Sequence, residues 1–264
     1  MSESEFWKKS SIENGFQTVE IKSWKDFSGF IMSVDKNEPI CWRGQKCDEK
    51  EWPLESAFDR IIKGQNRNRD KILKKHCNTT AYAFRGRIHN PSIREIKKEI
   101  KAKSLNINHL WAICRHHGLA TPLLDWTKSP FVAAYFAFAE PEGKSQIEHR
   151  FIYALKYKMA YKINLNPPPN FEWFDPLSSE FPRLLNQDGM FTIMDDGRCI
   201  KLFIEEQSKG YNDDWVLMKI KISNKNRKEF LRHLNLMNIN HLTLFPDPYG
   251  ASEFCNINLE IGLL

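Results

Sequence analysis

The residues best suited by type to chemistry lie in one stretch, 116–139, which reads HHGLATPLLDWTKSPFVAAYFAFA. Asp125 and Thr127 follow a short apolar pair, and Pro130 then opens a run without charge. A carboxylate and a hydroxyl at the start of a helix suit a polar ligand, and the free amides and positive dipole there suit phosphate. Asp125 would partly offset that attraction. An ordinary capped core helix is the alternative, with Thr127 or Asp125 as its N-cap.

An arginine that closes an apolar strand is the second candidate. Residues 38–44 (EPICWRG) predict a strand, in which Arg43 stands directly before Gly44. A buried arginine needs an anionic partner, whereas a surface arginine can bury its stem and keep its charge in water. Arg43 and Asp125 could therefore form a ligand site, or they could pair with each other and fix the fold.

Hydrophobic spacing indicates which elements position these residues. Residues 1–15 are polar and predict a flexible N-terminus, and 16–264 predict a single domain. Strands are expected at 16–22, 38–44, 150–157, 215–222 and 242–245. Helices are expected at 24–33, 53–62, 79–87, 91–102, 110–116, 130–139, 227–236 and 250–256. This mixture without a βαβ rhythm predicts an α+β fold with a mixed or antiparallel sheet core and surrounding helices.

Composition limits the function classes. The net charge of +6 over 264 residues is compatible with an anionic small molecule, a nucleotide or a nucleic acid. A basic run at 63–78 is either a solvated helix face or a phosphate-backbone contact. The six cysteines include no Cys-x-x-Cys pair, which indicates reduced thiols in a cytoplasmic protein and predicts no metal site. No apolar window is long enough for a membrane span.

Several segments together resemble the FRG domain family of bacterial and phage-linked proteins. The family is named for an aromatic-Arg-Gly signature, which appears here as Trp42-Arg43-Gly44-Gln45. Its most specific block, His-Gly-Leu-Pro-Thr-Arg-Leu-Leu-Asp-Trp-Thr before an Ala-rich helix, matches His117 to Thr127. Order and spacing agree over about residues 38–256. Further matches are Leu54, Ser56, Phe58 and Arg60, then Arg183, Gln187, Gly189 and Phe191, then Leu244 to Asp247.

The sequence departs from the family pattern at several places. Ala120 and Pro122 stand where the family pattern has Pro and Arg, and Arg115 stands where it has Gln. The final Leu-Asp-Gly of the pattern is replaced by Pro248-Tyr249-Gly250. The missing arginine at 122 matters most if that position touches an anion. A divergent or inactive member of the family is therefore one of the expectations.

The resemblance implies a role in a bacterial phage-defence or toxin-type system. The order of its motifs is also similar to that of ADP-ribosyltransferases, which implies an NAD-consuming enzyme with NAD as its substrate. By that similarity Arg43 would hold the NAD diphosphate or ribose, and Thr127 would order the nicotinamide ribose. Phe131 or Tyr135 would support the ring, or both would simply pack in the core. His241, Asp247 and Glu253 are the candidates for the late catalytic residue, and Asp125 could be the carboxylate instead.

The predicted site is thus large. The candidate catalytic residues are Arg43, Asp125 and Thr127. The candidate ligand-binding residues are Gly44, Gln45, Arg60, His117, Trp126, Tyr135, Arg183 and Gln187.

Three functions remain open from the sequence. An NAD-consuming transferase or hydrolase requires Arg43, Asp125 and Thr127 to converge on one pocket. A nuclease or other enzyme on nucleotides or RNA would use His116 or His117 with Arg43 and Asp125 as its acid–base set. A non-catalytic module that binds a nucleotide or nucleic acid needs no converging carboxylate.

Overall fold

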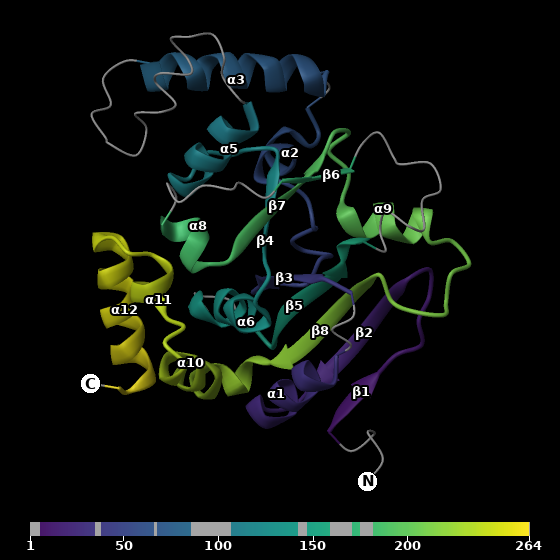
Figure 1. Cartoon of the computed structure of the whole chain (residues 1–264), viewed down its shortest axis with the longest axis vertical. Coiled ribbons are helices and arrows are strands. Elements are labelled where there is room, and N and C mark those ends of the chain that lie inside the picture. Colours follow the sequence, from purple (N-terminus) through teal and green to yellow (C-terminus); the bar gives the residue numbers. More distant parts are fainter. Residues whose placement is uncertain are drawn as a thin grey trace.

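A computed structural model describes residues 6–34, 38–65, 68–85, 107–141, 147–158, 171–174 and 182–263 of the chain (Figure 1). The helix predicted at 91–102 lies outside these residues. The described part is a single α+β domain built on one sheet of eight strands, as the sequence predicted.

The sheet is mixed, and its strand order is β1-β2-β8-β5-β3-β4-β7-β6. Only β2 and β8 run parallel among the described strands; all the other neighbours are antiparallel. The strands are β1 (Trp7–Lys9), β2 (Phe16–Ile21), β3 (Ile40–Gln45), β4 (Leu123–Thr127), β5 (His149–Lys156), β6 (Phe171–Phe174), β7 (Gly189–Met194) and β8 (Leu217–Ser223).

The sheet has a seam between β3 and β4. These two strands share a single paired position, Trp42 opposite Thr127, whereas β3 pairs with β5 along its whole length. The seam therefore separates a five-strand part, which ends at β3, from a three-strand part, which begins at β4.

Helices cover both faces of the sheet (Figure 1). On one face α1 (Trp24–Ser33), α6 (Pro130–Ala139) and α10 (Arg227–Leu236) share a core with residues of β2, β3, β5 and β8. On the other face α9 (Ile200–Gln207) packs against side chains of β4, β5, β7 and β8. The remaining helices are α2 (Ala57–Ile62), α3 (Arg69–Arg85), α5 (Ile107–His116), α8 (Pro182–Asn186), the short 3-10 turn η3 (Asn224–Asn226), α11 (His241–Leu244) and α12 (Pro248–Ile261).

Helix α6 is the predicted central helix. It begins at Pro130 and is buried on most sides, which confirms the interpretation of its uncharged sequence. The predicted cap is wrong, however. Ser129 is the N-cap, because its hydroxyl accepts from the amide of Val132 at 3.3 Å. The Thr127 hydroxyl is engaged elsewhere.

Two other local predictions are corrected. Residues 242–245 form no strand; they lie in and just after α11, where Asn240 and Thr243 make a capping box that favours a helical turn. The N-terminus is ordered earlier than expected, because Trp7–Lys9 form the edge strand β1 on β2. In contrast, α1 with its Ser23 cap and α10 begin and end where the sequence predicted.

Candidate functional site

Arg43 bridges the seam between β3 and β4. Its Nη1 donates to the main-chain oxygen of Asp125 at 2.8 Å, and its Nε donates to Gln45 Oε1 at 3.0 Å. Only 12% of the Arg43 side chain is exposed. The guanidinium therefore satisfies a carbonyl on β4 where regular pairing with β3 has ended, and Gln45 fixes its orientation. Gln45 is buried and in turn donates to the main-chain oxygen of Trp52 at 3.0 Å.

Asp125 receives guanidinium groups from two directions. Arg115 Nη2 lies 2.8 Å from Asp125 Oδ2, and Arg115 Nε lies 3.2–3.3 Å from the two carboxylate oxygens. Arg43 Nη1 lies 3.7 Å from the same Oδ2. The Asp125 side chain is still 40% exposed. This ion pair therefore lies at an opening to solvent and is not sealed in the core.

Arg60 completes what we call the arginine cluster, which consists of Arg43, Arg60, Arg115 and Asp125. Arg60 donates to the main-chain oxygen of Glu55 at 2.6 Å, and its guanidinium lies 5.2 Å from the centre of the Trp52 ring. Three guanidiniums and one carboxylate give these four residues a formal charge of +2.

Burial and the charges within the cluster shift the pKa values of its three arginines. Burial lowers the pKa of Arg43 to about 10; the charges of Arg115 and Arg60 lower it too, and that of Asp125 opposes them. Burial and the charge of Arg115 also lower the pKa of Arg60. The pKa of Arg115 is raised by Asp125. All three arginines are thus protonated near neutral pH, and at Arg43 and Arg60 the effect of burial on the pKa exceeds that of the nearby carboxylates.

Trp52 adds an unused donor beside the cluster. Its indole Nε1 is buried and has no hydrogen-bond partner among the described residues. Buried polar groups without a partner are uncommon in folded proteins.

Gly44 allows the backbone of α6 to pack closely against β3. A Cβ at this position would lie 1.9 Å from the main-chain oxygen of Ala133 and 2.5 Å from the main-chain nitrogen of Ala137, both in α6. The backbone of α6 thus crosses β3 closely at Gly44, which leaves no space for a ligand on that side of the residue.

Trp126 and Thr127 use their polar atoms inside the fold. The buried Trp126 ring donates to Thr192 Oγ1 at 2.9 Å. Thr127 Oγ1 donates to the main-chain oxygen of Gln187 at 2.6 Å and accepts from the Ser129 amide at 3.0 Å. The Gln187 side chain reaches Leu244 O at 3.0 Å, so these contacts tie the end of β4 to α11.

Tyr135 and Arg183 lie at the C-terminal helices and not at the arginine cluster. The hydroxyl of the buried Tyr135 lies 2.8 Å from His241 Nδ1. Arg183 Nε donates to Asp247 Oδ2 at 2.8 Å, and Asp247 also caps α12 by accepting from Gly250 N at 2.9 Å. His241 and Asp247, two of the candidates for the late catalytic residue, are therefore committed to this second group of contacts.

Glu253, the third of those candidates, lies in α12 near the same group, since its charge raises the pKa of His241 against the effect of burial. The other predicted residue, His117, is exposed in the turn after α5. Of the predicted residues, Arg43, Gln45, Arg60 and Asp125 come together.

Arg115 was missed as a site residue. The sequence showed it only as an arginine where the family pattern has glutamine, and its role depends on where α5 ends relative to β4. The sequence did contain one signal. The segment that lacks the family's arginine at position 122 gains an arginine at position 115. The described residues contain no group of three or more His, Cys, Asp or Glu side chains placed to hold a metal. None of the described helices has the length and apolar character to cross a membrane.

In the comparisons with known proteins, one family model matches the part of the chain that contains the arginine cluster. The family model described as the FRG domain matches residues 38–146. The match contains β3, α2, α5, β4 and α6, and it includes every residue of the arginine cluster. A search of curated proteins and a search of solved structures each found no match.

Proposed function

Because residues 38–146 form an FRG domain, we propose that this domain binds the phosphates of a nucleotide at its arginine cluster. The observation that carries the proposal is the excess of guanidinium groups around Asp125. Arg115 and Arg43 both approach one carboxylate, which is 40% exposed, and Arg60 adds a further charge. Guanidinium groups bind phosphate oxygens in a bidentate manner and stay charged when partly buried.

The neighbours of the cluster suit a nucleotide better than free phosphate. Trp52 lies directly under Arg60 and has a spare indole donor. The Trp52 ring is only partly buried, and an aromatic ring beside a phosphate site can contact the sugar or the base of a nucleotide. NAD, which combines a diphosphate with two ribosides, is the first ligand to test.

Binding is favoured over catalysis by the state of the carboxylates. Stabilising an oxocarbenium-like centre requires a carboxylate directed at the reacting carbon. Asp125 is neutralised by Arg43 and Arg115, and Asp247 is held by Arg183. Thr127, the expected ribose contact, has its hydroxyl bonded within the fold. A nuclease is less favoured still, because the His117 side chain is exposed in the turn after α5 and lies outside the group of predicted residues that come together.

Cleavage of NAD is the second candidate function, and one observation favours it. Arg115 contacts the Asp125 carboxylate, and this side chain is 40% exposed. A ligand phosphate that took over Arg115 would leave the carboxylate facing the ligand, which is the arrangement that cleavage requires. A role in bacterial phage defence or a toxin-type system rests on the family resemblance alone.

The test is calorimetric titration with NAD, ADP, AMP and adenosine. We expect the diphosphates to bind most tightly, AMP more weakly and adenosine not measurably. The substitutions Arg60→Gln and Arg115→Gln should each weaken ADP binding by about tenfold or more, because each removes charge-assisted hydrogen bonds. Arg43→Lys, which keeps the charge and loses the planar fork, should also weaken it.

Arg198→Gln is the matched control, since Arg198 is a partly exposed arginine paired with Glu206 near α9. Adenosine binding as tightly as ADP, or an equal loss in the control variant, would refute the phosphate site. Release of nicotinamide from NAD, measured on the same samples, decides between binding and cleavage. Release that Asp125→Asn abolishes would establish the second function in place of the first.

A further inference from the structure

A second basic region lies at the other end of the sheet, outside the FRG match. Strand pairing places Lys8 opposite Glu20 and Glu20 opposite Lys221, so these three side chains form a row across β1, β2 and β8. His149 of β5 pairs with Ser223, two residues along β8 from Lys221, and so lies on the same face.

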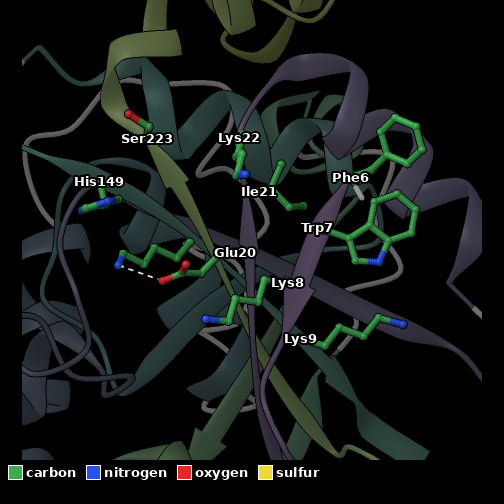
Figure 2. A pocket seen from close by; sticks show the side chains of 10 residues that line it. Phe6, Trp7, Lys8, Lys9, Glu20, Ile21, Lys22, His149 and Ser223 are labelled. Carbon is green, nitrogen blue, oxygen red and sulfur yellow. Dashed lines mark hydrogen bonds and ion pairs between the residues drawn. The ribbon is translucent and has the colours of Figure 1, made fainter. Parts of the chain in front are cut away.

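This part of the sheet face is hollowed. A cavity of about 670 Å³ is lined by residues of β1, β2, β5 and β8 (Figure 2). Helix α9 packs against the Leu217 end of β8, whereas the lining of the cavity includes the other end, Lys221 and Ser223. We call this cavity the β1 groove. Its volume falls within the range of ligand sites in proteins.

The β1 groove is positively charged. Four lysines line it, against a single carboxylate, Glu20. Glu20 accepts from Lys221 Nζ at 3.0 Å, and this contact, together with the charges of Lys8 and His149, lowers the pKa of Glu20. The contact with Lys221 thus occupies the Glu20 carboxylate, which leaves Lys8 and Lys22 to attract an anion. Lys9 extends to the other face of β1, where its Nζ lies 5.9 Å from the centre of the Phe30 ring.

An exposed aromatic ring lies at the same place. Phe6 is 37% exposed at the rim of the β1 groove, and its ring centre is 6.4 Å from that of Trp7. Trp7 packs edge-on against Phe30 of α1 at 5.5 Å, so it anchors the rim to the core. Figure 2 shows Phe6 and Trp7 together on one side of the groove and His149 on the other.

We propose that the β1 groove binds a short segment of single-stranded nucleic acid. Lysines would contact successive phosphates, and Phe6 would stack on a base. Single strands are bound by grooves that combine basic side chains with aromatic platforms. A cavity admits a splayed-out base, which a duplex does not present. The basic run at 63–78 suits this role less well, because Arg69 is tied to Asp59 at 2.7 Å.

The test measures fluorescence anisotropy of labelled oligo(dT) of about ten nucleotides with the full chain, and compares a duplex of the same length. Lys8→Gln/Lys22→Gln should weaken binding of the single strand by about tenfold and reduce the salt slope by about 1.4, the value for two lost phosphate contacts. Phe6→Ala should weaken binding by about fivefold or more without changing the salt slope.

The matched control is Lys209→Gln/Lys228→Gln, which removes the same charge at exposed positions outside the groove. Equal losses in both double variants would mean general attraction to a basic protein and would overturn the proposal. Equal affinity for the duplex, or displacement of the oligonucleotide by ADP at the same phosphate concentration, would also overturn it. Arg115→Gln should leave oligonucleotide binding unchanged; a loss there would assign the single strand to the arginine cluster.

Discussion

Arg115 Nη2 donates to Asp125 Oδ2 at 2.8 Å, and this contact joins the end of α5 to the middle of β4. Asp125 thus has two effects on an incoming phosphate. It orients Arg115 and Arg43, and it competes with the ligand for both of them. The balance between these effects can be measured with one substitution.

Asp125→Asn should strengthen ADP binding by a few-fold to about tenfold, because it removes a negative charge from the site. The free energy of unfolding should fall by about 1–2 kcal/mol, since Arg43 and Arg115 lose a partner that is partly exposed. Titration calorimetry and urea unfolding measure the two quantities. Weaker ADP binding in the variant would mean that Asp125 acts mainly by orienting the arginines.

Gly44→Ala should destabilise the protein by more than about 2 kcal/mol. The new Cβ would lie 1.9 Å from the main-chain oxygen of Ala133, so α6 would have to move off β3. Gly29→Ala is the control, because Gly29 is exposed in α1 and its nearest neighbour would be 3.7 Å away. That variant should gain about 0.5–1 kcal/mol from helix propensity. Similar urea midpoints for the two variants would contradict this packing.

The burial of His241 predicts a pH dependence of stability. Burial lowers the pKa of His241, with Glu253 and Asp247 opposing and Arg183 assisting. The unfolded chain, where histidine titrates near about pH 6.5, therefore takes up this proton first as the pH falls. The contribution is complete above about pH 6.5 and is lost as the pH falls from there through the lower pKa of the folded state.

Unfolding free energies at about pH 7.5 and 5.5 test this sign. His241→Asn should show a smaller loss of stability on acidification than the wild type, whereas His117→Asn, a change at an exposed histidine, should show the same loss. A His241→Asn variant with an unchanged difference between the two pH values would show that other groups carry the pH dependence.

Two substitutions of Asp247 distinguish a structural role of this residue from a catalytic one. Asp247→Asn can still cap α12 but loses its ion pair with Arg183, so we expect a loss below about 1 kcal/mol. Asp247→Ala loses both and should cost about 1–2 kcal/mol more than a neutral surface change. Thermal unfolding ranks the variants. ADP binding at the arginine cluster should be the same in both; a selective loss of binding in the asparagine variant would place Asp247 at the ligand.

Local sequence signals predicted much of this fold. The uncharged run after Pro130 identified α6, and alternation identified β2 and most of β8. A pairing of Arg43 with Asp125 was one of the two alternatives that the sequence left open. The Thr127 hydroxyl was not placed correctly, because its partner Gln187 is remote in sequence and the closer residue Ser129 is an equally good cap. Residues 242–245 are too few for their alternation to distinguish a strand from a helical turn.

The candidate site was predictable only in part for a related reason. Gly44 and Arg60 stand at motif positions that look equivalent in a sequence. Their roles differ because α6 crosses Gly44 closely, while Arg60 lies beside Trp52. Arg115 depended on the angle at which α5 meets β4, which no spacing in the sequence specifies.

Because of the seam between β3 and β4, a ligand bound at the arginine cluster would connect two separate parts of the sheet. Arg43 belongs to one part of the sheet, and Asp125 to the other, so the strands meet through one backbone pair and a guanidinium. A phosphate held by Arg43 and Arg115 together would link the two parts of the sheet across the seam. Ligand binding would then slow hydrogen exchange of the β4 amides that face the seam.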